Sequence, residues 1–189
     1  MVEGNRYSAV AMVLHWTIAA LIVIQLCLGW YMNEIVPDHS PLQDRVQDIH
    51  VTVGLSILIL VLVRIGWRLV HPTPPLPSGM PAWERILARA SHLLFYVLLL
   101  AMPLTGWALV SVRHEGIPFF GLAWPAMPML DHMAKAQARA VGGQLKHIHI
   151  FILVWVVLIN LALHVAGAIK HQFDGNPVLW RMLPLRRPG

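Results

Sequence analysis

The stretch YSAVAMVLHWTIAALIVIQLCLGWYM, residues 7–32, contains no Asp, Glu, Lys or Arg, and one histidine, His15, lies inside it. About 20 apolar residues in a helix cross the hydrocarbon core of a membrane, so this stretch predicts a transmembrane helix. Its apolar run is too long for the core of a signal peptide, and no small-residue cleavage site follows it. The stretch also raises the question of why an apolar span holds a polar imidazole.

The whole chain has the composition of an integral membrane protein. It has 189 residues, of which 57% are hydrophobic and 12% charged, whereas about a quarter of the residues of a soluble domain are charged. Four apolar stretches qualify as spans, at about 9–32, 49–70, 91–112 and 147–169. We therefore expect an all-α membrane four-helix bundle that forms a single domain over 1–189. Residues 113–146 are expected to be a long loop folded back on the membrane surface.

The distribution of basic residues predicts the orientation of the chain. If the N-terminus is cytoplasmic, nine Lys and Arg residues lie inside and five outside. Those inside are Arg6, Arg64, Arg68, Arg85, Arg89, Lys170, Arg181, Arg186 and Arg187, and those outside are Arg45, Arg113, Lys135, Arg139 and Lys146. The positive-inside rule then places both termini in the cytoplasm. No basic patch with interleaved aromatic residues is present, so we expect no nucleic-acid partner.

Histidines recur in or at the ends of the expected spans. They are His15, His50, His92, His149 and His164, with His147 at an edge. A polar group in hydrocarbon costs several kcal/mol unless it has a partner. Any single histidine could find that partner by forming a hydrogen bond with a group on another helix. Because successive spans run in opposite directions, however, the histidines also sort by depth.

Two depths emerge from this sorting. His50 lies near the outer face with His149 or His147, whereas His15 lies nearer the cytoplasm with His164, and His92 is close to them. Two layers of paired imidazoles in a four-helix bundle are what two bis-histidine haems require. The chain has no CxxCH motif, so the haems would be held non-covalently.

Residues on the histidine faces of the helices fit this interpretation. Fourteen residues are nearly four helical turns, about 21 Å, and Gly29, Arg64 and Gly106 follow His15, His50 and His92 at that spacing. Gly29, and Gly54 one turn from His50, would leave room for a flat macrocycle, and Arg64 would pair with a propionate. The alternatives are close helix packing for the glycines and an interfacial charge for Arg64.

The last span is less regular. His149 and His164 are 15 residues apart, which leaves them about 60° out of phase on an α-helix. His147 has a better phase but lies 17 residues from His164. A π-bulge would absorb one residue and bring His149 into line. We favour His149 as the outer ligand and keep His147 as the alternate.

The motifs and their order resemble the bacterial cytochrome b561 family, which is related to the dihaem cytochrome b subunits of nickel–iron hydrogenases and formate dehydrogenases. The resemblance covers almost the whole chain. The motifs that carry it are LHW (14–16), His50, PTPP (72–75), SH (91–92), MPLTGW (102–107), HIH (147–149), LALHVAGAIKHQF (161–173) and RMLP (181–184).

The resemblance implies a protein of the bacterial inner membrane with two b haems, whose ligands would be His15, His50, His149 and His164. His92 would neighbour a quinone or a propionate. The family usually separates the two ligands of its fourth helix by 14 residues, where this chain has Ile150. Stand-alone members are linked to quinones, and some are thought to oxidise superoxide and reduce ubiquinone.

The leading hypothesis is therefore a dihaem b-type cytochrome that moves electrons across the membrane to or from a quinone, in the manner of a superoxide oxidase. Five residues of the outer loop could steer a small anion, although charges in a loop are more often simply solvated: Arg113, His114, Lys135, Arg139 and Lys146. One alternative is an anchor subunit of a dehydrogenase or hydrogenase, in contact with a redox partner subunit or a second copy. Another is a haem-free, histidine-lined proton or metal transporter.

Overall fold

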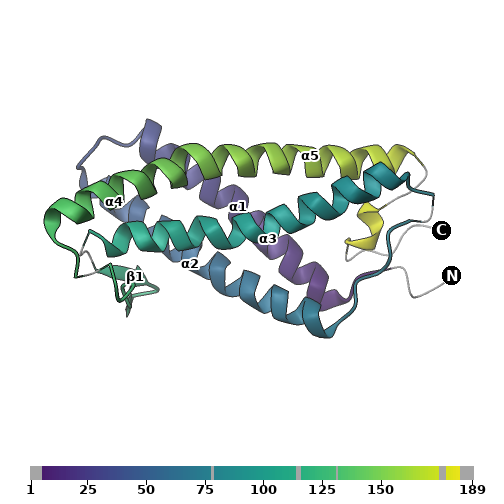
Figure 1. Ribbon diagram of the computed structural model, residues 1–189, viewed down its shortest axis with the longest axis horizontal. Coiled ribbons are helices and arrows are strands. Elements are labelled where there is room, and N and C mark those ends of the chain that lie inside the picture. Colours follow the sequence, from purple (N-terminus) through teal and green to yellow (C-terminus); the bar gives the residue numbers. More distant parts are fainter. Residues whose placement is uncertain (1–5, 78, 114–115, 131, 175–177, 184–189) are drawn as a thin grey trace.

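The computed structural model describes residues 6–77, 79–113, 116–130, 132–174 and 178–183. The helices are α1 (Ala9–Glu34), α2 (Pro41–Val70), α3 (Ala82–Ser111), α4 (Lys135–His147) and α5 (Val154–Phe173), and a π-helical segment (Ile148–Leu153) joins α4 to α5. Four helices are long and apolar enough to cross a membrane, the fourth running from Lys135 to Phe173. They pack as an elongated bundle (Figure 1), which confirms the predicted all-α membrane architecture.

Lipid, and not water, is the solvent that suits the outside of this bundle. A small core forms where Ile18, Ile57 and Val61 meet between α1 and α2. Many large apolar side chains of the bundle are exposed, such as Val97 of α3 with 55% and Trp155 of α5 with 62% of its surface exposed. Exposed apolar area costs about 25 cal/mol per Å² in water, but nothing comparable against acyl chains.

Three of the helices extend beyond the expected spans. Helix α2 begins at Pro41 and not near 49, because Ser40 caps it and a proline fits the first helical turn. Helix α3 begins at Ala82, directly after Pro81, so the polar lead before residue 91 belongs to the same helix. The fourth span begins at Lys135, because α4 continues without a break into the π-helical segment.

The expected loop over 113–146 is therefore mostly regular structure. It contains an antiparallel hairpin of β1 (Ile117–Phe119) and β2 (Leu122–Trp124), followed by α4. Phe120 and Gly121 both have positive φ, as a type I′ turn requires. The segment is held against the bundle, since Thr52 donates to the Pro118 carbonyl at 3.2 Å.

The opposite end of the bundle gathers both ends of the described chain (Figure 1). The backbone N–H of Tyr7 donates to the Arg181 carbonyl at 3.2 Å. The Trp16 indole donates to the Met182 carbonyl at 2.7 Å, next to the short helix η3 (Leu179–Arg181). We call this the termini end and the other the hairpin end.

Candidate functional site

Two histidine pairs lie between the helices, one toward each end of the bundle. The hairpin-side pair is His50 of α2 and His149 of the π-helical segment, with ring centres 6.2 Å apart. The termini-side pair is His15 of α1 and His164 of α5, with ring centres 6.3 Å apart. The fold thus brings together the histidines that the sequence predicted to lie at the same depth.

The separation within each pair suits one metal atom between the rings. A metal bound to two imidazole nitrogens at about 2.0–2.1 Å each holds the ring centres roughly 6 Å apart. A direct hydrogen bond between two imidazoles would bring them to roughly 5 Å. Among the described residues, no cluster of three or more His, Cys, Asp or Glu could hold a metal ion. Paired imidazoles on facing helices suit the two axial positions of haem iron.

The π-helical segment decides which histidine faces His50. A π-helix takes more residues per turn than an α-helix, so it turns His149 toward the bundle interior as the 15-residue spacing required. His147, the alternate, is exposed and lies against Phe151, with ring centres 5.3 Å apart. The predicted π-bulge is confirmed, and the structure places His149 and not His147 beside His50.

Thr105 holds the second nitrogen of His149. Its hydroxyl lies 2.9 Å from His149 Nδ1, and also 2.8 and 2.9 Å from the carbonyls of Ala101 and Met102. A hydroxyl has one proton, which a carbonyl accepts here, so the Oγ1 atom accepts from His149 Nδ1–H. The lone pair of His149 is then on Nε2, the tautomer in which Nε2 can bind a metal.

His50 has a different environment. Its Nδ1 is buried and has no hydrogen-bond partner among the described residues, whereas its backbone carbonyl accepts from Gln25 Nε2 at 2.8 Å. A Cβ added to Gly29 would lie 3.5 Å from the His50 ring, and one added to Gly54 would lie 3.2 Å from Gln25. Gly29 and Gly54, expected beside the macrocycle, thus make room for the His50 ring and for the Gln25 amide that binds the His50 carbonyl.

Gly106 has the same function for the other ring of the hairpin-side pair. A Cβ at this position would lie 3.1 Å from Cε1 of His149, closer than real Cβ contacts usually are. Glycine therefore lets α3 approach the ring closely.

The termini-side pair has a cation and a third imidazole beside it. Arg64 Nη1 is buried without a hydrogen-bond partner in the described part of the chain, and its charge acts on His15, His92 and His164. A buried, unpaired guanidinium nitrogen is costly, and a carboxylate such as a haem propionate would satisfy it. The His92 ring centre lies 5.3 Å from that of His164, too close for an iron atom between them.

The basic residues singled out from the outer loop meet at the hairpin end. One open cleft of about 450 Å³ is lined by Arg113, Lys135, Arg139 and Lys146, together with apolar residues from the end of α3 and from α4. His114, Arg186 and Arg187 lie outside the described residues. Four cations around one cleft favour a small anionic ligand.

Sequence reasoning missed Thr105 as a partner of His149 and Tyr96 as a partner of the basic residues. Arg68 Nη1 donates to the Tyr96 hydroxyl at 3.3 Å. Both had a signal, because a polar side chain in an apolar span needs a partner. Tyr96 is also one turn after His92, on the same helix face.

The chain matches known proteins over nearly its full length. Residues 6–185 match the model of prokaryotic cytochrome b561. The chain is 31% identical to cytochrome b561 homolog 2 of Escherichia coli (strain K12), over 95% of this chain and 92% of that protein. It is 28% identical to the probable superoxide oxidase CybB of Yersinia pestis, over 97% and 98%.

A further relative is cytochrome b562 of Cereibacter sphaeroides, 26% identical over 92% of this chain and 91% of that protein. The chain therefore belongs to the prokaryotic cytochrome b561 family, and it is a multi-pass bacterial membrane cytochrome that carries electrons on b-type haem.

Proposed function

We propose that this cytochrome binds two b haems, one in each histidine pair, and moves electrons across the bacterial inner membrane from superoxide outside to ubiquinone. The observation that carries the proposal is the pair of imidazole separations, 6.2 and 6.3 Å, at two depths of one bundle. When bound, haem with two axial imidazoles exchanges single electrons and leaves no iron position for oxygen.

The residues of the chain then have distinct tasks. His50 and His149 would hold the hairpin-side haem, and His15 and His164 the termini-side haem, with Arg64 against a propionate. His15 and Gly29 are 14 residues apart on α1, and a Cβ added to Gly29 would lie 3.5 Å from the His50 ring. The two pairs therefore lie about 21 Å apart along that helix. Two macrocycles at these depths would shorten the gap that an electron has to cross.

The hairpin end faces the outside in this proposal, with both termini in the cytoplasm. The excess of basic residues on the side of the termini supports this orientation. The basic cleft would attract superoxide, a small anion, to the hairpin-side pair. A relative whose name is probable superoxide oxidase, similar over 97% of this chain, supports the same substrate.

Haem content and electron transfer test the proposal together. The purified protein is expected to hold about two haems per chain and to show a b-type spectrum on reduction. Superoxide from xanthine oxidase should reduce these haems, and added ubiquinone-1 should reoxidise them. A folded, colourless protein, or haems that superoxide leaves oxidised, would contradict the proposal.

Removing charge from the basic cleft should slow the reaction with superoxide. In the double variant Arg139→Gln/Lys146→Gln, we expect the rate constant at low ionic strength to fall on the order of tenfold, because electrostatic steering is lost. The rate should also depend less on salt. Pulse radiolysis at several ionic strengths measures both. Arg45→Gln is the matched control, since Arg45 lies at the same end but does not line the cleft.

Thr105→Val should raise the midpoint potential of the hairpin-side haem. Valine keeps the shape of threonine but cannot accept the proton of His149 Nδ1, so the imidazole becomes a weaker donor to oxidised iron. One hydrogen bond is worth about 1 kcal/mol, which corresponds to roughly 40 mV for one electron. Potentiometric titration of both haems measures the shift, and Thr105→Ser should restore the potential. An unchanged potential would remove Thr105 from this role.

A further inference from the structure

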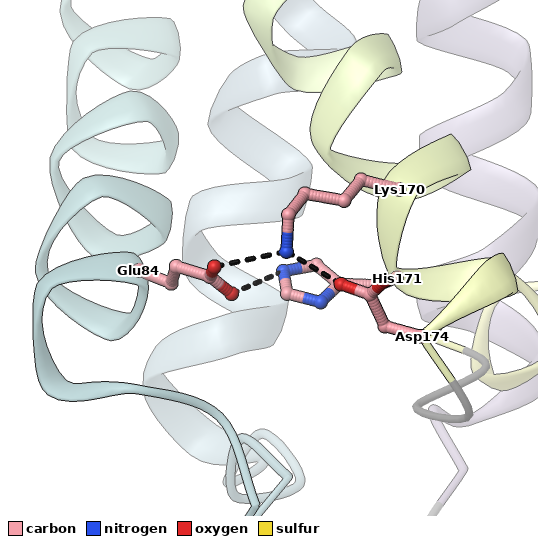
Figure 2. Close-up of polar contacts among 4 residues, drawn as sticks. All are labelled: Glu84, Lys170, His171 and Asp174. Carbon is pink, nitrogen blue, oxygen red and sulfur yellow. Dashed lines mark hydrogen bonds and ion pairs between the residues drawn. The ribbon is translucent and has the colours of Figure 1, made fainter.

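A second polar cluster joins α3 to α5 at the termini end, away from the histidine pairs (Figure 2). Glu84, in the first turn of α3, accepts from Lys170 Nζ through Oε1 at 2.9 Å. Its other oxygen, Oε2, lies 3.5 Å from His171 Nε2. Asp174, four residues after Lys170 on the same helix end, also pairs with Lys170 (Figure 2).

The cluster changes from exposed to buried across a short distance. The side chains of Lys170 and Asp174 are 51% and 45% exposed, whereas those of Glu84 and His171 are 9% and 12% exposed. His171 Nδ1 is fully buried and has no hydrogen-bond partner among the described residues. The Glu84–Lys170 ion pair alone would suffice to hold α3 and α5 together. The buried His171 imidazole, whose Nδ1 has no hydrogen-bond partner in the described chain, therefore needs another explanation.

His171 also has a defined position relative to the termini-side pair. It follows His164 by seven residues, two turns of α5, so both rings lie on the same helix face about 10 Å apart along the axis. Because α5 ends at Phe173, His171 is the one nearer to water. An imidazole and a carboxylate in contact form a group that can accept a proton from water and release it inward.

We infer that Glu84 and His171 form a proton-uptake site. The site takes up a proton from the water at the termini end when the haem proposed for the termini-side pair is reduced, and it supplies this proton to quinone. This inference rests on the proposed function. Ubiquinone takes two electrons and two protons to become ubiquinol, and two superoxide ions supply the electrons as they become two molecules of O₂. The two protons that ubiquinone takes up would pass through Glu84 and His171.

The charge of an arriving electron is what would drive proton uptake. At about 10 Å and an effective dielectric constant near 20, one negative charge raises the proton affinity of a neighbouring group on the order of tenfold. In the described part of the chain, the ion pairs of this cluster add Lys170 and Asp174 of α5 to Glu84 and His171. Lys170 and Asp174 are half exposed to water, so His171 is the buried group that an added charge inside the bundle would affect most.

Potentiometry at several pH values tests the coupling without turnover. In the wild-type holoprotein, the midpoint potential of the termini-side haem should fall as pH rises. A tenfold rise in proton affinity on reduction corresponds to a total fall of about 59 mV. In His171→Gln and in Glu84→Gln, the midpoint potential should depend much less on pH. Asp174→Asn is the matched control, because it removes a carboxylate that pairs with Lys170, whereas the carboxylate that pairs with His171 is that of Glu84. A variant His171→Gln with the wild-type pH dependence would overturn the inference.

Two electron acceptors test the use of the proton. Pre-reduced haems should be reoxidised by ferricyanide, which takes no proton, at the same rate in His171→Gln as in the wild type. Reoxidation by ubiquinone-1 should be on the order of tenfold slower in the variant. If His171→Gln slowed reoxidation equally with both acceptors, or if Asp174→Asn slowed reoxidation by ubiquinone-1 as much, the role of His171 would be structural and the inference would be overturned. A wild-type protein that does not react with ubiquinone-1 would refute the proposed function itself.

Discussion

Replacing His149 by alanine is expected to leave about one haem per chain where the wild-type protein holds about two, because the iron of the hairpin-side haem loses an axial ligand. His50→Ala should cause the same loss, since the two rings face each other at 6.2 Å. Haem extraction and protein assay give the ratio. The spectrum of the remaining haem should be identical in both variants, because both leave the termini-side pair intact.

His147→Ala is the control for this experiment. His147 is two residues away but exposed and in contact with Phe151, so its removal should leave both haems in place. Added imidazole should restore the lost haem in His149→Ala by filling the vacated ligand position. If His147→Ala loses a haem and His149→Ala retains both, the assignment of the outer ligand is wrong.

Deleting Ile150 is expected to leave both haems bound. The π-helical segment holds one residue more than an α-helix needs between the two histidine depths, and removing one lets it close into α-helix with His149 and His164 in phase. His149 and His164 are then 14 residues apart, nearly four turns of α-helix. Haem content and the two midpoint potentials measure the outcome.

An insertion at the same helix should have the opposite effect. One alanine added after Val154 rotates His149 by about 100° relative to His164, and the π-helical segment already contains the surplus that it can absorb. We expect this variant to lose the hairpin-side haem, although its composition is nearly unchanged. Retention of two haems after the insertion, or loss of one after the deletion of Ile150, would show that the segment does not set the ligand phase.

Much of the architecture could be predicted because the bilayer imposes it. A span needs about 20 apolar residues, and alternating directions then sort His15, His50, His149 and His164 by depth. The ends of the helices were predicted less well. Their first turns, such as QDRVQD before His50, are polar and lie outside the apolar window, so hydropathy alone ends the helix too early.

The partners of the histidines could be predicted only in part. The phase mismatch between His149 and His164 predicted a π-bulge, because helix geometry is periodic. The hydrogen bond from His149 to Thr105 could not be predicted, since the two residues lie on different helices and the rotation of α3 depends on packing. The same holds for Glu84 and His171, whose contact joins the first turn of α3 to the last turns of α5.

The number of spans, the depth of each imidazole and the need for an extra residue in the fourth span could all be read from the amino-acid sequence. These features follow from hydrophobic length and helical rise, which depend on neighbours along the chain. Which ring faces which, where four basic residues form a cleft, and which carboxylate reaches His171 became known from the packing of the helices. Those features depend on how helices rotate and pack against each other, and small contacts such as that of Gly106 with His149 determine the rotation.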